Sequence, residues 1–271
     1  MKRIELTTTR RRVAPVLAAM LCLLVTGCGG GDDSKAIGEP GPPVGQPVLP
    51  DLVPAPPSQV QMTRLEGKWY IRFTSILVNV GESDFVLRAS RGIRDWQVEQ
   101  DIPYSTSGAE PVSVDATLVW GGDGHGHWHV SRVASVRLVA VPENGDAVAG
   151  EKARVDTKIG FCFFDYSQQL ERGPDEAVYS RESCGDKNDT QIGMGLSPGW
   201  GDTYHFVLPG QYIDVSGLPD GRYRLWAEVD ERGWFREVTR DNNRTWVDIE
   251  LSTRPDRLRT ALIVEVGPEP A

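Results

Sequence analysis

KWYIRFTSILVNVG, residues 68–81, alternates apolar and polar side chains and ends in a glycine turn. Alternation with a period of two places every second side chain on one face of a β-strand. Comparable runs recur between turn residues, over residues 113–120, 129–141, 202–208, 223–230 and 245–251. No stretch shows a convincing helical period of 3.6. Short strands separated by Gly, Pro and Asn turns are typical of packed antiparallel sheets, so the sequence predicts an all-β fold, an antiparallel β-sandwich with long loops.

Two segments fit the strand pattern less well. Residues 165–198 are polar and poor in strand-forming residues, and we expect a long loop excursion there. Loops of that length in a compact domain carry function or are mobile. The tail, residues 253–271, is ambiguous because ALIVEV at 261–266 has the composition of a last strand.

The first 27 residues predict a secretory signal peptide. A basic start precedes VAPVLAAMLCLLV, residues 13–25, which is shorter than the ~20 residues needed to span a bilayer. The run ends in VTGC, residues 25–28, which resembles the lipobox of bacterial lipoproteins. The resemblance implies cleavage before Cys28 and acylation of Cys28, with a stable membrane anchor because each buried methylene contributes ~0.8 kcal/mol. An ordinary cleaved signal with an incidental cysteine is the alternative.

The residues after Cys28 predict a tether and then one domain. Residues 28–59 are crowded with glycine and proline and show no period, so we expect a disordered tether. The folded domain is then expected over residues 60–252, which is long enough for a sizeable core. Residues 253–271 would be a C-terminal tail. The expected location is the cell envelope, outside the cytoplasm and lipid-anchored to a membrane.

The charge balance is acidic. The whole chain has a formal net charge of −9, and residues 1–27 carry five basic residues and one acidic residue, so their removal leaves −13. An acidic protein of this kind does not favour nucleic acid as a partner. It attracts cationic partners such as amines or lysine-rich proteins, although salt screens this attraction.

The chain has four cysteines, Cys22, Cys28, Cys162 and Cys184. Cys22 leaves with the signal peptide and Cys28 would be acylated. The other two would lie outside the cytosol, where a Cys162–Cys184 disulfide is the expected state. Its loop of about 20 residues would stabilise the fold by ~3 kcal/mol through chain entropy. A metal site made of the two cysteines is the alternative.

Three of the four histidines lie in HGHWH, residues 125–129. Spacing of i, i+2 and i+4 puts His125, His127 and His129 on one face of a strand, whereas a helix would separate them. In a straight strand the outer Cα atoms lie ~13 Å apart, whereas metal–nitrogen bonds are ~2 Å. The backbone must therefore curl, which Gly124 and Gly126, together with the GGDG segment at 121–124, permit. Three imidazoles suit Cu(II), Zn or Ni; a solvent-facing polar edge is the alternative.

Further motifs follow the histidines in a fixed order. KIGFCFFD at 158–165 comes next, then GLSPGWGDTYHFVLPGQYID at 195–214 and DNN at 241–243, while RFTSILVNVGESDF at 72–85 precedes them. Together these motifs resemble the catalytic domain of the lysyl oxidases over roughly residues 65–252. The resemblance implies that the three histidines bind copper and that Lys158 and Tyr204 form the family's lysine tyrosylquinone. Taken singly, a lysine is usually a surface residue and a strand tyrosine usually a core ring.

The resemblance implies an oxidoreductase. It would be a copper-dependent amine oxidase that deaminates primary amines, with peptidyl lysine as one candidate, to aldehydes, consuming dioxygen and releasing hydrogen peroxide and ammonia. Asp202 is the expected base, because it lies two residues from Tyr204 and shares its strand face. His205 and Asp214 are weaker candidates, and Asp214 is better suited to cap a turn. The rivals are a non-enzymatic copper-binding envelope lipoprotein and an adhesive or structural sandwich module.

The chain departs from the animal members of that family in its cysteines. Gly126 and Trp200 stand where those members have cysteines beside the copper histidines and beside DTY. Trp128 stands where a different aromatic residue is usual, and PENGDAVAG at 142–150 has the look of an insertion. Of the cysteines that could fix loops in this domain, only Cys162 and Cys184 remain.

Overall fold

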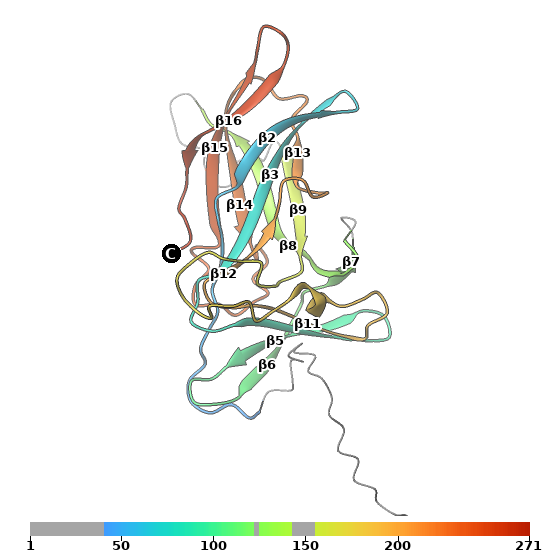
Figure 1. Cartoon of the computed structure of the whole chain (residues 1–271), viewed down its shortest axis with the longest axis vertical. Helices are drawn as coiled ribbons and strands as arrows, with labels where there is room; N and C mark the ends of the chain where they lie inside the picture. The colour runs from blue at the N-terminus through green and yellow to red at the C-terminus, as the bar shows by residue number, and fades with distance from the viewer. Residues whose placement is uncertain (1–40, 122–124, 143–154) are drawn as a thin grey trace, which may run out of the picture. The chain divides into compact units, whose positions relative to one another are not determined.

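The computed structural model describes residues 41–121, 125–142 and 155–271 (Figure 1). The expected signal peptide, Cys28, the first part of the tether and most of the expected insertion lie outside these residues. The described residues belong to one compact unit, Ile37–Ala271, and are β-structured apart from the short 3₁₀ helix η1 (Arg181–Cys184). All strand pairs are antiparallel, so the predicted all-β fold is confirmed. Within the described ranges no helix has the length and apolarity to cross a bilayer.

Three sheets make up the fold. The first is built around β3 (Lys68–Asn79), which pairs with β1 (Leu52–Pro54), β2 (Ser58–Leu65), β12 (Trp200–Tyr204) and β13 (Tyr212–Asp214), with β10 (Ser167–Gln168) beyond β12. The second has the order β16 (Arg259–Val266), β15 (Arg244–Thr253), β14 (Gly221–Val229), β8 (Trp128–Ala140) and β7 (Leu118–Trp120), and β9 (Val155–Phe161) pairs with β8. The third has the order β11 (Gln191–Leu196), β4 (Phe85–Arg91), β5 (Trp96–Pro103) and β6 (Ala109–Val114).

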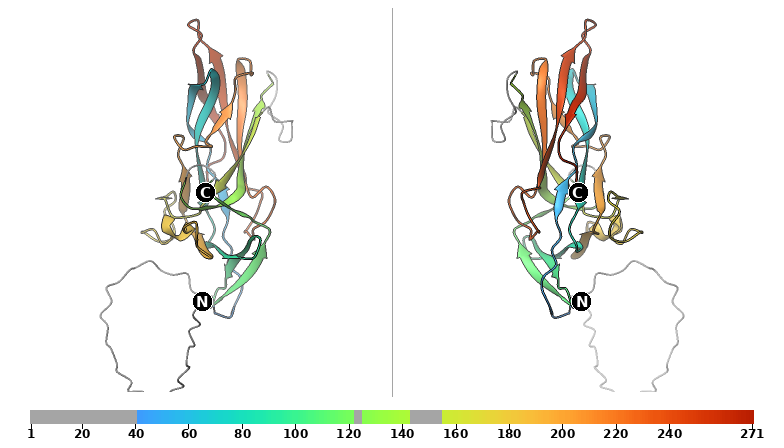
Figure 2. Two further views of the ribbon diagram at one scale, coloured as in Figure 1. Left: turned by 90° about the vertical axis from the view of Figure 1, so that its right-hand side faces the viewer. Right: turned by 90° about the vertical axis from the view of Figure 1, so that its left-hand side faces the viewer.

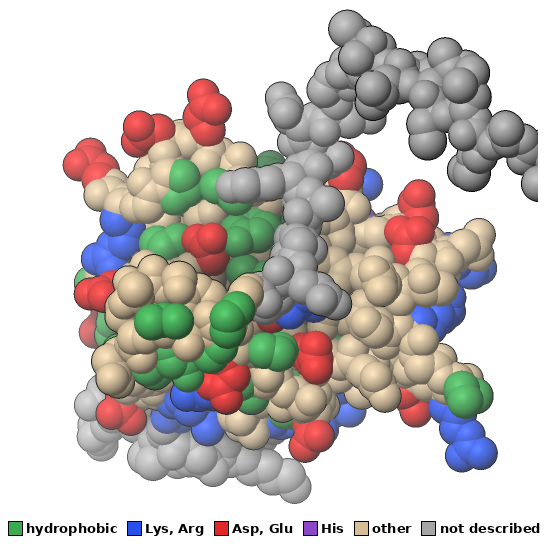
Figure 3. Space-filling view, turned by 90° about the horizontal axis from the view of Figure 1, so that it is seen from below, with side chains coloured by type: hydrophobic (Ala, Val, Ile, Leu, Met, Phe, Trp, Pro, Cys, Tyr) green, Lys and Arg blue, Asp and Glu red, His purple; other side chains and the backbone are tan. Residues whose placement is uncertain are grey.

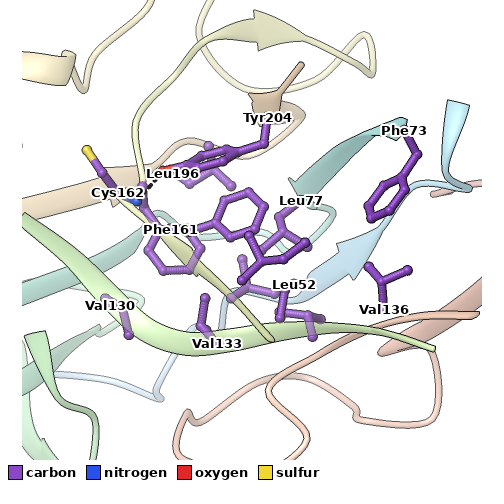
Figure 4. Packing of buried hydrophobic residues seen from close by; sticks show 14 of the residues in the cluster. Leu52, Phe73, Leu77, Val130, Val133, Val136, Phe161, Cys162, Leu196 and Tyr204 are labelled. Carbon is purple, nitrogen blue, oxygen red and sulfur yellow. Dashed lines mark hydrogen bonds between the residues drawn. The ribbon is translucent and has the colours of Figure 1, made fainter. Parts of the chain in front are cut away.

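The first two sheets pack face to face, as the sandwich prediction required (Figure 2). Because of the alternation in KWYIRFTSILVN, the side chains of Ile71, Phe73 and Leu77 of β3 all point into the same hydrophobic core. The facing sheet supplies Leu138, Leu225 and Ile249, all fully buried. Burial of each such side chain contributes about 1.5–3 kcal/mol. Figure 4 shows part of this core, in which Leu52, Leu77 and Phe161 lie between the strands.

The third sheet closes one end of the sandwich and was not expected. Strand β11, like the short β10 of the first sheet, lies inside residues 165–198, so the prediction of a loop excursion over this whole segment was wrong. The segment is polar in composition, but Gly195 lets the Tyr179 ring lie over β11, since a Cβ there would be 2.4 Å from that ring. Seen from this end, acidic, basic and hydrophobic side chains are interspersed on the surface (Figure 3).

Asp165 orders the segment that follows it. The buried carboxylate accepts hydrogen bonds from the amides of Val178 (2.8 Å) and Tyr179 (3.2 Å), and from the amide and hydroxyl of Ser197 (both 2.8 Å). The two ends of the loop are therefore tied to one side chain. Hydrogen bonds to a charged acceptor contribute about 1.5–3 kcal/mol each.

The expected disulfide between Cys162 and Cys184 is present, with a Cα–Cα distance of 5.9 Å. Both cysteines are buried in the core. The alternative of a metal site made of these thiolates is therefore excluded. The disulfide joins the end of β9 to η1 and is typical of oxidising compartments outside the cytoplasm.

Both ends of the compact unit extend past the range expected for the folded domain. Leu52 lies in the region expected to be a tether, yet it is fully buried and β1 pairs with β3. An apolar side chain that fills the core outweighs the proline-rich composition around it. At the other end, ALIVEV forms most of β16 and pairs with β15, which resolves the ambiguity of the tail in favour of a strand.

Glu237 holds β1 in place and makes stability depend on pH. Its carboxylate accepts hydrogen bonds from the Leu52 amide (2.8 Å) and the Asn243 side chain (3.1 Å). Burial raises the pKa of Glu237 to about 7, and the neighbouring Asp230 and Asp51 add to the rise. The folded state thus holds this proton more tightly than the unfolded state, so stability present below about pH 4.5 is lost as the pH rises through about 7.

We expect Glu237→Gln to flatten that dependence. Urea unfolding at about pH 5.5 and about pH 8.5 should show a smaller loss of unfolding free energy in the variant than in the wild type, because the amide has no proton to release. Equal pH dependence in the two proteins would show that Glu237 is not the titrating group.

Candidate metal centre

The histidines lie where a hairpin loop enters a strand. β7 and β8 pair through Leu118↔Val130, Val119↔His129 and Trp120↔Trp128, and the loop between them contains HGH. The strand begins only at Trp128, so His125 and His127 lie in curled backbone. The curl that metal binding requires is therefore present.

The three imidazoles form a group that can hold a metal ion. Their nearest ligand nitrogens all lie within 4.8 Å of one another, and the ring centroids of His127 and His129 are 4.6 Å apart. Nitrogens bound to one ion at ~2.0–2.1 Å lie about 3–4 Å apart, so small side-chain rotations would complete the site. His127 and His129 are buried, whereas His125 is partly exposed. The donor set suits a borderline metal such as copper.

Gly121 closes the histidine loop. Its amide donates a hydrogen bond to the His127 carbonyl (3.0 Å), and its φ of +39° is one that residues with a side chain rarely adopt. A Cβ at this position would lie 2.0 Å from the His125 carbonyl oxygen. Gly121 is the first residue of the GGDG segment that the sequence predicted to permit the curl.

We expect Gly121→Ala to weaken metal binding, because the clash forces His125 away from the other two ligands. The loss should be at least about tenfold, as is typical when groups that orient metal ligands are altered. Gly126→Ala is a suitable control, because a Cβ there meets nothing within 4 Å. Competition titration with a copper chelator would measure both; equal affinities for the two variants would refute the role of Gly121.

Gly160 lets β9 approach His129. A Cβ on this residue would lie 3.3 Å from the His129 Cβ and 3.1 Å from the Val130 carbonyl oxygen. Both contacts are tighter than a side chain ordinarily tolerates. The glycine of KIGFCFFD therefore allows the strand that carries Lys158 to lie against His129, a candidate metal ligand.

Tyr204 lies beside the histidines. Its ring centroid is 6.0 Å from that of His125 and 6.1 Å from that of His129. The ring packs on Phe161 at 4.2 Å, and its hydroxyl oxygen accepts a hydrogen bond from the Cys162 amide (3.1 Å; Figure 4). The buried phenol is thus held next to the candidate metal site by two consecutive residues of the β9 end.

Asp202 is fully buried on the strand that carries Tyr204. Burial raises the pKa of this carboxyl well above the usual value for aspartate, and Asp165 adds to the rise. The Thr203 amide lowers the pKa of Asp202 by a smaller amount, although it does not meet the geometry of a hydrogen bond. Neither carboxyl oxygen of Asp202 has a hydrogen-bond partner in the described chain. A buried carboxyl with a perturbed pKa, two residues from the phenol, is a candidate for proton transfer at this site.

The two weaker base candidates differ from Asp202 in their surroundings. Asp214 accepts hydrogen bonds from the Ser216 amide (2.9 Å) and hydroxyl (2.6 Å), which is the turn-capping role that the sequence favoured. These bonds and the ion pair with Lys68 lower the pKa of Asp214 to about 2. His205 follows the end of β12 and packs against the Phe206 ring at 4.4 Å. Neither position resembles the buried setting of Asp202.

Lys158 lies in β9, where its backbone pairs with Ser135 of β8. It is two residues before Gly160 and four before Cys162. Its strand therefore borders both His129, through Gly160, and Tyr204, through Cys162.

The fold and site define an all-β protein with a three-histidine centre next to a buried tyrosine. The family model for lysyl oxidase matches residues 104–259, so the chain belongs to the lysyl oxidase family. No curated protein matches the chain significantly. The family resemblance expected from the motifs is thereby confirmed, and the matched residues contain the histidines, β9 and β12.

Proposed function

We propose that the protein is a copper-dependent amine oxidase whose quinone cofactor is made from Lys158 and Tyr204. The observation that carries the proposal is the position of the Tyr204 ring, 6.0 Å from His125 and 6.1 Å from His129. Family membership supports the reaction class. Primary amines, with peptidyl lysine among the candidates, would react with dioxygen and water to give aldehydes, hydrogen peroxide and ammonia.

In this proposal, residues of the chain bind the copper ion and orient the Tyr204 ring. His125, His127 and His129 would hold copper, and copper with the quinone would supply the redox chemistry that side chains lack. The Cys162 amide and the Phe161 ring fix the Tyr204 ring. Lys158 is assigned as the partner of Tyr204 because its strand borders both the metal ligands and the tyrosine.

Asp202 is proposed as the base that removes a proton from the carbon next to the amine nitrogen. Replacement by asparagine should lower turnover by about 10²–10⁴-fold, the range for loss of a general base. Copper affinity should not change, because Asp202 is not among the metal-ligand group. Asp214→Asn is the matched control, since Asp214 serves a turn. Steady-state peroxide release measures both variants, and equal rates for Asp202→Asn and the wild type would remove Asp202 from the mechanism.

The second candidate function is copper binding without catalysis. It accounts for the histidines, but it gives no role to a buried phenol and a buried carboxyl on one strand beside them. Peroxide release from primary alkylamines and lysine-containing peptides separates the two functions. We expect release with copper-loaded protein and none after chelation; a copper-loaded protein that oxidises no amine would favour the binding protein.

We also propose that the protein acts in the cell envelope, tethered through an acylated Cys28. The disulfide supports an oxidising compartment, and the VTGC sequence supports the anchor. Membrane fractionation of a Cys28→Ala variant tests this proposal: the variant should leave the membrane fraction, and retention at the wild-type level would contradict the anchor.

A further inference from the structure

Trp128 lies between two metal-ligand residues of HGHWH and is almost fully buried. Trp128 is the first residue of β8, so it joins the curled loop that carries His127 to the strand that carries His129. The proposed chemistry gives Trp128 no role. Its contacts nevertheless connect the histidine strand to parts of the molecule that the sequence did not predict.

The Trp128 indole contacts two other tryptophans and a cation. Its ring centroid is 5.0 Å from that of Trp96 in β5 and 5.4 Å from that of Trp120 in β7, both edge to face. The Arg91 guanidinium lies 5.3 Å from the Trp128 ring and 5.5 Å from the Trp96 ring. Such aromatic pairs and cation–π contacts have preferred geometries, so they orient a ring as well as bury it.

The indole N–H donates a hydrogen bond to the Asp186 carbonyl (3.0 Å). Asp186 follows Cys184 by two residues, so the disulfide fixes the segment that accepts this bond. Arg91 holds the same segment from β4: its amide donates to the Thr190 carbonyl (2.8 Å), and its guanidinium donates to the Lys187 carbonyl (3.4 Å). The surface under the indole is therefore fixed by covalent and hydrogen bonds.

We propose that Trp128 is a positioning residue for the metal. Its indole, seated on Trp96, Arg91 and the Asp186 carbonyl, sets the direction in which His127 and His129 point. Any rotation of the strand at residue 128 would turn both imidazoles at once, so an anchored indole keeps them directed at one point. The disulfide contributes by holding the Asp186 carbonyl. This inference rests on the three histidines being a metal site, and it does not depend on the quinone or on amine oxidation.

The test is copper binding by purified full-length protein in three variants. Trp128→Leu removes the ring, and Trp128→Phe keeps a ring but loses the N–H donor. Arg91→Leu removes the guanidinium that contacts the Trp128 and Trp96 rings. Trp226→Leu is the matched control, because Trp226 is an indole of the same sheet that packs instead near Trp246. The probe is Cu(II) alone, with affinity from chelator competition and ligand geometry from the copper hyperfine splitting in electron paramagnetic resonance.

We expect Trp128→Leu to weaken Cu(II) binding by about 10–100-fold, the range for loss of a group that orients metal ligands, and to change the hyperfine splitting. Trp128→Phe and Arg91→Leu should show smaller changes in the same direction, and Trp226→Leu none. A residue that only packs would lower the unfolding temperature without altering the spectrum of the folded protein. Wild-type affinity and spectrum in folded Trp128→Leu overturn the inference. If Trp128→Leu does not fold, wild-type affinity and spectrum in both Trp128→Phe and Arg91→Leu overturn the inference. Failure of the wild type to bind copper would instead contradict the proposed function.

Discussion

His127→Ala is expected to lose copper binding. The variant removes one of three imidazoles whose ligand atoms lie within 4.8 Å of one another, and His127 is one of the two buried members of that group. The two remaining imidazoles, of His125 and His129, would bind the ion without the third nitrogen. We expect affinity to fall by at least about 100-fold, which corresponds to about 2.7 kcal/mol of binding free energy.

The measurement for His127→Ala is copper stoichiometry after dialysis, together with chelator competition. His205→Ala is the control, because His205 is the fourth histidine of the chain and is not among the metal-ligand group. Copper at about 100 times its dissociation constant should stabilise the wild type by ~2.7 kcal/mol and the His127→Ala variant hardly at all. A variant that retains one tightly bound copper would show that the three histidines are not the site.

Tyr204→Phe is expected to abolish amine oxidation while copper binding persists. Phenylalanine keeps the ring that packs on Phe161 at 4.2 Å, but it has no phenol oxygen from which a quinone could form. Loss of the hydrogen bond from the Cys162 amide leaves that donor buried, at a cost of about 1–3 kcal/mol. The fold should survive this cost, so peroxide release should vanish from an intact copper protein.

The control for Tyr204→Phe is Tyr223→Phe, which removes a similar hydroxyl that donates to the Pro219 carbonyl (2.9 Å). Both variants should be compared for copper content, unfolding temperature and peroxide release from a primary alkylamine. Oxidation of the amine by Tyr204→Phe at the wild-type rate would mean that the cofactor does not include this tyrosine.

The central sandwich strands could be predicted from the sequence because their pattern is local. β3, β8 and β14 are rich in apolar residues, and most of these apolar side chains are buried. β12 ends earlier than expected, at Tyr204, because the Leu208 amide turns back to the His205 carbonyl (2.9 Å). A turn of apolar residues carries no local signal that separates it from a strand.

The third sheet could not be predicted, because its pairing joins distant segments. β11 pairs with β4 through Met194↔Leu87 and Gly195↔Val86, and nothing in either segment specifies the other. The position of β1 could not be predicted either. Leu52 is buried because β1 pairs with β3 and because the Leu52 amide donates a hydrogen bond to Glu237. Local composition there, rich in proline, indicated a tether.

Some features of the candidate site could likewise be predicted from the local sequence, and others could not. The histidine group followed from residue type and spacing, and the curl was anticipated from the glycines. The approach of Tyr204, the supporting bond from Cys162 and the anchoring of Trp128 depend on tertiary contacts between β12, β9 and the third sheet. Family motifs pointed to Tyr204, but physical reasoning from its own neighbours in the sequence could not have placed it beside the histidines.

The most direct test of the central claim is peptide mapping by mass spectrometry of the purified protein expressed with and without copper. We expect the peptides carrying Lys158 and Tyr204 to become covalently joined in the copper-expressed protein and to stay separate without copper. Protein that binds copper at the histidines while these two peptides remain separate would contradict the account, and the chain would then be a copper-binding member of its family without the quinone.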